Sequence, residues 1–405
     1  MPEDNTLTTF GGRVRFFRDR AGMSRAVLGE LCGRSEAWAK AIETSKIGMP
    51  SLSMLIRMAE ILHVNDLAEL TGEQRLTMAT YTKRTHEQAP AITEALSAYP
   101  LVVSDREPVS ADVLAANVSQ AWMVWHGSPN QRTAVATILP RLLVDARTSV
   151  RLLEGSDRRR ALVSLAQVYH LIQLYLAFQP YPELILLASD RAMQAAQDAD
   201  DPKAMAAATW YLNHVWRDAG EQAEARIDLA HQAGRLLRPD DDHDDRSLWG
   251  LLQLAMALSY AKTGRRGDAE HHWDEARRAA HSLDGHHPWL MFGPGMVDAY
   301  AVTMAADLTN GYEATRQGDR IDLTTIPSKT RRAFHTVEIA RGFYLKKEPV
   351  ATIHLLNKAH DISPDTISYN MFTRSTVSEL MATGGATVRD EARDLAHKIR
   401  LIPAA

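Results

Sequence analysis

The stretch from Ser24 to Leu62 constrains the fold most, because its pattern is that of two short helices joined by a tight turn. Ser24 and Ser35 each precede a helical segment and can cap its first turn, while Gly33 supplies the turn between the two segments. A third amphipathic segment follows Pro50. The pattern predicts a small all-helical domain whose second helix spans residues 35–43.

An ordered series of residues in and around this stretch resembles the helix-turn-helix domain of XRE/Cro/C1-type bacterial regulators. The series is Gly12, Val14, Arg15, Arg18, Ser24, Leu28, Gly33, Ser35, Ile42, Glu43, Pro50, Ser51 and Leu52. The resemblance implies a five-helix DNA-binding domain over residues 1–72. The family commonly has Gln where this chain has Arg25, and small polar residues where it has Trp38 and Lys40. These departures concern the target sequence and leave the expected fold unchanged.

The second helix of this motif supplies the candidate base-reading residues. Ala39 and Ile42 define the side that packs on the domain, so the opposite side can face DNA. The N-terminal part of this helix enters the major groove in proteins of this class. Lys40 suits guanine, Glu36 can accept a hydrogen bond from cytosine, and alanines can touch thymine methyl groups. The side expected to face DNA holds Glu36, Ala37, Lys40, Ala41 and Thr44.

Positively charged residues near helix starts and turns can contact phosphates. Residues 13–46 contain eight Lys or Arg and four Asp or Glu, whereas the whole chain has a net charge of −4. Trp38 either shields the small core or donates its indole N–H to a phosphate. The predicted DNA-binding residues are Arg25, Arg34, Ser35, Glu36, Ala37, Trp38, Lys40, Ala41, Thr44 and Lys46.

Few hydrogen bonds to bases are available from these side chains. We therefore expect part of the specificity to come from DNA shape, or from a homodimer that binds an inverted-repeat operator in double-stranded DNA.

The composition excludes several classes of protein. Cys32 is the only cysteine, which excludes a disulfide framework and fits a reducing cytoplasm. Neither a secretory leader nor a run of eighteen uncharged apolar residues is found, so we expect a cytoplasmic protein without membrane contact. Arginine outnumbers lysine and alanine is abundant, which suits a high-GC, actinobacterial genome.

The rest of the chain is expected to be a linker and a long helical domain. Periodicity weakens over residues 73–109, where we predict a linker that contains a short helix at 92–98. Residues 110–405 show long amphipathic helices and little strand pattern. The predicted helix pairs are 112–125 with 132–153, 160–178 with 183–198, 204–218 with 222–237, 247–262 with 267–283, and 331–345 with 350–362.

Two of these pairs resemble tetratricopeptide repeats. Ala225 and Ala269 each lie five residues after a turn glycine, where a small residue lets two helices approach closely. We therefore predict a tetratricopeptide-like α-solenoid.

A helix-turn-helix domain followed by such a solenoid resembles the RRNPP class of Gram-positive regulators. This resemblance implies a solenoid that dimerises and binds a small peptide or another small molecule. The first helix of each pair should line a concave surface. The candidate effector-binding residues there are Tyr169, Gln173, Trp210, Asn213, His214 and Arg217, unless their polar groups are satisfied within helix packing.

Catalysis and cofactor binding are not expected. The chain has no G-x-S-x-G, P-loop, G-x-G-x-x-G or H-E-x-x-H motif. A histidine cluster could bind zinc or copper, but adjacent histidines on a helix point about 100° apart, so we expect no metal. The cluster is His271, His272, His281, His286 and His287. The segment 289–295 is either a buried loop or the wall of an effector pocket.

The leading hypothesis is thus a ligand-responsive transcriptional regulator. The alternative is an adaptor or antitoxin-like protein whose solenoid captures a protein partner.

Overall fold

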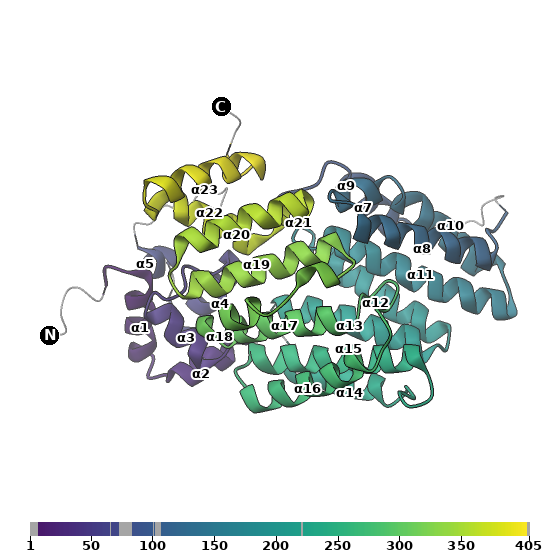
Figure 1. Ribbon diagram of the computed structural model, residues 1–405, viewed down its shortest axis with the longest axis horizontal. Coiled ribbons are helices and arrows are strands. Elements are labelled where there is room, and N and C mark those ends of the chain that lie inside the picture. Colours follow the sequence, from purple (N-terminus) through teal and green to yellow (C-terminus); the bar gives the residue numbers. More distant parts are fainter. Residues whose placement is uncertain are drawn as a thin grey trace.

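The computed structural model describes residues 7–64, 66–72, 83–99, 101, 107–219 and 222–402, excluding the side chains of residues 218 and 219. Every regular element in these ranges is a helix, which confirms the all-α prediction (Figure 1). None of the helices so described is both long and apolar enough to cross a membrane.

The N-terminal domain consists of five short helices: α1 (Phe10–Arg20), α2 (Arg25–Leu31), α3 (Glu36–Glu43), α4 (Leu52–Ile61) and α5 (Leu67–Thr71). The side chains of Ser24, Ser35 and Ser51 cap α2, α3 and α4, as the sequence predicts. Val14, Leu28 and several other apolar side chains from all five helices form the core.

The short helix predicted within the linker belongs to the second domain. This helix is α7 (Ala89–Ser97), three residues longer at its start than expected. Its residues Ala89, Ile92 and Leu96 are fully buried in the largest apolar core, together with residues of α10 and α11. The helical part of the predicted linker is therefore a structural element of the second domain.

Helix pairs make up the second domain, and every predicted pair is present. The helices are α8 (Ala111–Gly127), α9 (Gln131–Ala136), α10 (Leu139–Leu152), α11 (Gly155–Leu176), α12 (Pro182–Asp198), α13 (Pro202–Ala219), α14 (Ala223–Gly234), α15 (His243–Lys262), α16 (Arg266–His281), α17 (Pro294–Asp307), α18 (Gly311–Gly318), η1 (Leu323–Thr325), α19 (Lys329–Leu345), α20 (Pro349–Ile362), α21 (Pro364–Tyr369), α22 (Met371–Thr383) and α23 (Ala386–Lys398). The predicted helix 132–153 is divided into α9 and α10. The pairs α17 with α18 and α22 with α23 were not predicted.

We expected the small residue five positions after each turn glycine to be buried between its two helices. This expectation holds for one of the two pairs. Ala269 of α16 is fully buried, as expected for a close approach to α15. Ala225 of α14 is exposed, and the buried residues of that helix are Arg226, Ile227, Ala230 and Ala233. The paired-helix solenoid is observed, while its assignment as tetratricopeptide repeats stays a prediction.

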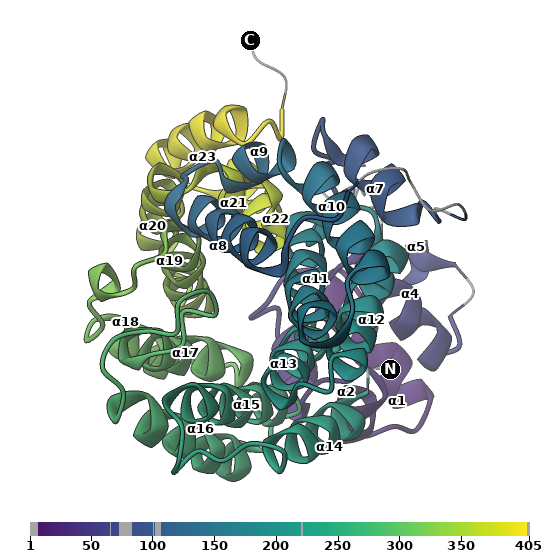
Figure 2. The ribbon, with the colours of Figure 1, turned by 90° about the vertical axis from the view of Figure 1, so that its right-hand side faces the viewer.

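The solenoid closes on itself. In Figure 2, α8, α11, α13, α15, α17 and α19 surround the centre, and their partner helices lie outside them. Hydrogen bonds join the two ends of this array. His126 Nδ1 and Ser328 Oγ are 2.8 Å apart, although the residues are 202 positions apart in sequence. Thr330 Oγ1 donates to the Trp125 carbonyl at 2.9 Å. We call this closed array the ring.

The N-terminal domain lies against one end of the ring, at the left in Figure 1. The contacts come from the C-terminal ends of α15, α17 and α19. Lys46 Nζ donates to the Thr309 carbonyl at 2.9 Å, and Lys347 Nζ donates to the Ser45 carbonyl at 2.9 Å. The N-terminal domain is therefore in direct contact with the ring.

Candidate nucleic-acid interface

The turn between α2 and α3 has the geometry that its residues predict. Gly33 has φ of 63°, in the left-handed region that glycine adopts without strain. Ser35 Oγ then accepts a hydrogen bond from the Trp38 backbone N–H at 3.1 Å, which begins α3 one residue later. The short connection holds α3 against α2 and α1.

A buried ion cluster fixes the end of α3. Glu43 is almost fully buried and accepts hydrogen bonds from Arg18 Nε at 2.5 Å and from Arg25 Nε at 2.7 Å. The hydrogen bond from Arg18 to Glu43 raises the pKa of Arg18. The cluster ties α1, α2 and α3 together. Arg25, predicted to contact phosphate, remains about one-third exposed and can do so with its free guanidinium edge.

Four of the predicted base-reading residues form an exposed face of α3. Glu36, Ala37, Lys40 and Thr44 are all exposed. Ala41 was predicted to lie on the same exposed face, but it is only 2% exposed, so this prediction is wrong. The cause is local, because the backbone N–H groups of Lys46 and Ile47 fold back onto the Ala41 carbonyl at 2.8 and 3.2 Å. The chain that follows α3 therefore covers this position.

Trp38 and Cys32 serve the domain core. Trp38 is half-buried against the core cluster, which favours its interpretation as a shield over its interpretation as a phosphate contact. Cys32 is fully buried, and burial raises the pKa of its thiol to about 11. A thiol in this state is a small apolar packing group.

The remaining predicted residues lie at the two ends of α3, beside the ring. Ser35 is buried, Arg34 is half-buried, and Lys46 donates to Thr309 of the ring. These residues at the two ends of α3 are therefore less exposed than the face formed by Glu36, Ala37, Lys40 and Thr44.

The family comparison agrees with this geometry. A family model described as a helix-turn-helix domain matches residues 9–71. A search of curated proteins found no match to the chain. The match covers α1 to α5, so the N-terminal domain is a helix-turn-helix domain. We call this domain the reader.

The predicted effector residues fall into separate places. Trp210 and His214 lie together on α13, with ring centroids 4.3 Å apart. Gln173 Nε2 donates to the Tyr211 carbonyl, and Asn213 Nδ2 donates to the Thr209 and Arg226 carbonyls, so both amides take part in helix packing. Arg217 lies near the buried carboxylate of Asp307 and lowers its pKa, as do Lys262 and Arg341.

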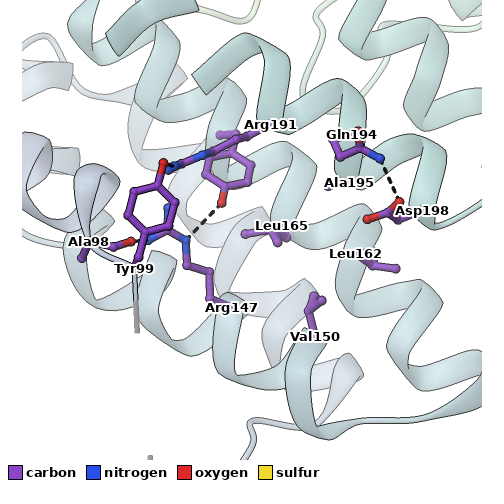
Figure 3. Close-up of a pocket in the computed structure, with 11 residues that line it drawn as sticks. Ala98, Tyr99, Arg147, Val150, Leu162, Leu165, Arg191, Gln194, Ala195 and Asp198 are labelled. Atoms are coloured by element: carbon purple, nitrogen blue, oxygen red, sulfur yellow. Dashed lines mark hydrogen bonds between the residues drawn. The ribbon is translucent and has the colours of Figure 1, made fainter. Parts of the chain in front are cut away.

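Tyr169 belongs to a different surface. Its hydroxyl accepts a hydrogen bond from Arg147 Nε at 3.1 Å, at a pocket between α7, α10, α11 and α12 (Figure 3). Arg191 stacks on Tyr99 in the same pocket, with its guanidinium carbon 5.0 Å from the centroid of the tyrosine ring. Tyr169 therefore does not join Trp210 and His214, because α11 presents it to the opposite side.

The inner wall of the ring contains an aromatic cluster that joins Trp289, from the segment 289–295, to residues that the sequence analysis did not single out. His170 stacks on Tyr211 with centroids 4.5 Å apart, and Trp122 lies 5.0 Å from Trp289. Trp289 comes from the loop 289–293, whose Leu290 and Phe292 are buried. The cluster joins α8, α11, α13 and this loop, which a single helical wheel cannot bring together.

Several buried polar atoms along the inner wall have no hydrogen-bond partner among the described residues. They are His170 Nδ1, Trp210 Nε1, Tyr211 Oη and both ring nitrogens of His335. Burial lowers the pKa of His170 to about 3 and that of His335 to about 3, so both rings are neutral at neutral pH. Such atoms are costly to bury without a partner, which marks the inner wall as unusual.

Arg331 lies close enough to Tyr211 and His335 for its charge to lower the pKa of both. It is half-buried, and its Nη1 donates to the Tyr300 hydroxyl at 3.2 Å. Within the described ranges it forms no ion pair with a carboxylate. Its charge adds to burial in lowering the pKa of His126 and of His335.

Of the histidine cluster noted in the sequence, His271 and His272 are in ring contact, with centroids 5.1 Å apart. His272 Nδ1 lies 2.7 Å from Gln253 Oε1, and His287 Nδ1 accepts a hydrogen bond from the Leu290 N–H. No group of three or more metal-ligating side chains is found in the part of the chain that the structure describes.

Proposed function

We propose that this protein is a sequence-specific transcriptional regulator that binds an inverted-repeat operator as a homodimer and responds to a small effector bound in its ring. The exposed face of α3, with Glu36, Ala37, Lys40 and Thr44, carries this proposal. The face lies on a helix-turn-helix domain and offers a hydrogen-bond donor, an acceptor and two small groups to base edges.

The homodimer follows from the small size of this face. Lys40 and Glu36 are the two side chains on it with charged hydrogen-bonding groups, and each good contact discriminates by about 1–3 kcal/mol. Two readers on two half-sites double the number of base contacts and give the affinity that operators require.

The inner wall of the ring supports an effector site. An unpartnered buried polar atom costs about 1–3 kcal/mol, and two residues with such atoms, Tyr211 and His335, lie close to the half-buried Arg331. A ligand with an anionic group and a flat apolar body would pair with Arg331 and stack on the half-buried Trp289. Effector binding would recover the cost of the buried groups.

Selection of bound duplexes from a random DNA pool with the full-length protein tests the DNA-binding proposal. We expect an inverted-repeat consensus. If neither the wild type nor the variant Gly264→Asn, introduced below, enriches any sequence, the regulator proposal is wrong and the partner-capturing alternative gains support.

The effector proposal has a separate test. The fluorescent anion 1-anilinonaphthalene-8-sulfonate serves as the probe, because it combines a sulfonate with flat aromatic rings. We expect saturable binding to the wild type and weaker binding to Arg331→Gln, while Arg320→Gln serves as the exposed control. Equal binding to all three proteins would contradict the assignment of Arg331.

A further inference from the structure

The start of the recognition helix α3 is pressed against the ring. A Cβ atom placed on Gly264 would lie 2.5 Å from Cβ of Ser35, so the backbone at Gly264 touches the residue that caps α3. Gly264 forms the turn between α15 and α16 with φ of 82°. This turn is the point where the ring reaches the N-terminus of α3.

The other end of α3 is held by three hydrogen bonds and an apolar contact. Lys46 donates to the Thr309 carbonyl, Lys347 donates to the Ser45 carbonyl, and the backbone N–H of Gly48 donates to the Tyr344 hydroxyl at 3.2 Å. Between them, Ile47 packs against an apolar cluster of α17, α18 and α19. We call Gly264, Thr309, Tyr344 and Lys347 the docking face.

A buried ion network makes the docking face rigid. Asp307 accepts hydrogen bonds from Lys262 Nζ at 3.3 Å and from Arg341. Lys262 precedes Gly264 by two residues, and Asp307 precedes Thr309 by two residues. The network therefore fixes the ends of α15, α17 and α19, which carry the docking face.

Docking uses groups at α3 that DNA would need. Phosphates beside a recognition helix are bound by residues at its ends, including the backbone at its N-terminus. Here the ring contacts Ser35 at one end and Lys46 at the other. An eight-residue helix is about 12 Å long and the major groove is about 12 Å wide, so contacts at both ends leave no room for the two phosphate backbones.

We infer that the docking face is a binding surface for this chain's own recognition helix, and that it competes with DNA phosphate for the two ends of α3. The inference rests on the proposed DNA-binding function and adds its regulation. A reader that is docked on the ring binds DNA only after it leaves the docking face. The measured DNA affinity is therefore the affinity of the undocked reader multiplied by the fraction of molecules that are undocked. The carbonyl of Thr309 takes the place of a phosphate oxygen for Lys46.

Gly264→Asn tests this inference. Asn tolerates the left-handed backbone of this turn, and its side chain would enter the space held by Ser35. Gly285→Asn is the matched control, because Gly285 has φ of 89° and nothing within 4 Å of an added Cβ. Both variants are compared with the wild type for binding to the selected duplex and for thermal unfolding.

Hydrogen exchange of the Gly48 amide reports docking independently of DNA, because its N–H donates to Tyr344. We expect faster Gly48 exchange and about tenfold tighter DNA binding for Gly264→Asn, which corresponds to ~1.4 kcal/mol of lost docking. Gly285→Asn should match the wild type in both. Lys347→Asn removes one hydrogen bond to the reader at a second left-handed residue, together with the contact of Lys347 Nζ with the Tyr344 ring, and should change both quantities in the same direction by less.

Two results would overturn the inference. Faster Gly48 exchange with unchanged DNA affinity would show that docking and DNA binding are compatible, and weaker DNA binding would show that docking supports the reader. These failures differ from failure of the proposed function, in which neither the wild type nor Gly264→Asn prefers any duplex.

Discussion

The reader and the ring both pair their buried charges, as Glu43 and Asp307 show, but they differ in their other buried polar groups. In the reader, the buried charges of Glu43 and Arg18 are paired, and the unpaired groups such as Lys40 are exposed on α3. In the ring, His170, Tyr211 and His335 are buried with polar atoms that find no partner among the described residues. The unpartnered atoms destabilise the folded ring, and under the proposed function a bound effector would offset this cost.

Removing the buried charge of Glu43 should give the largest difference in stability between the reader and the ring. Glu43→Gln leaves Arg18 and Arg25 beside a neutral amide, and losing one partner of a buried ion pair costs about 3–5 kcal/mol. We expect loss of DNA binding and fast hydrogen exchange throughout α1 to α3, with α13 and α15 still protected. Glu36→Gln is the control, because Glu36 is exposed on the same helix. Equal effects of the two substitutions would show that the Glu43 cluster is not structural.

Acid should destabilise the ring before the reader. Burial lowers the pKa of His170 to about 3 and that of His126 to about 4. The unfolded chain therefore binds more protons than the folded ring between about pH 6.5 and these values, so stability falls as the pH falls through that window.

The expected loss is on the order of 3 kcal/mol for one such histidine, at 1.36 kcal/mol for each pKa unit. Urea unfolding of the wild type and of His170→Phe at pH 7 and pH 4.5 measures it, and the variant should show the smaller change. A wild-type stability that rises on acidification would contradict the buried neutral state of these rings.

Lys40→Ala should remove sequence preference in the reader and leave the ring unchanged. The loss of one base contact costs about 1–3 kcal/mol on the selected operator, with little change on unrelated DNA. Competition binding with both duplexes provides the measurement. Unchanged affinity and preference would remove Lys40 from the base-reading set.

Arg25→Ala should give the smallest effect on preference. We expect weaker binding to all sequences and a salt dependence shallower by about one phosphate contact. Because Arg25 also pairs with Glu43, the variant should unfold at a slightly lower temperature as well. A loss confined to the operator sequence would instead place Arg25 at a base.

Local signals in the sequence predict much of the fold. The serine caps, Gly33 and the apolar spacing of α2 to α4 each act within a few residues, and the structure confirms them. Long helices of the ring follow from their periodicity for the same reason. Asp242 caps α15, so this helix begins at His243, four residues before the predicted start at 247.

Contacts between distant segments could not be predicted. The pairing of His126 with Ser328, the ring contact of Trp289 with Trp122 and the packing of Gly264 on Ser35 join residues far apart in sequence. Ala225 and Ala41 were misplaced because a single helical wheel assumes one packing direction and takes no account of the chain that follows. The candidate site therefore needed the structure, except for the exposed residues of α3.

The most direct test of the central claim is a titration of the selected operator and a scrambled duplex with full-length protein at two salt concentrations. We expect the protein to bind the operator more tightly than the scrambled duplex by a factor on the order of 10³ or more. This preference should persist at the higher salt concentration, while both affinities fall. Equal affinity for the two duplexes at both salt concentrations, in the wild type and in Gly264→Asn alike, would contradict the claim that α3 reads DNA sequence.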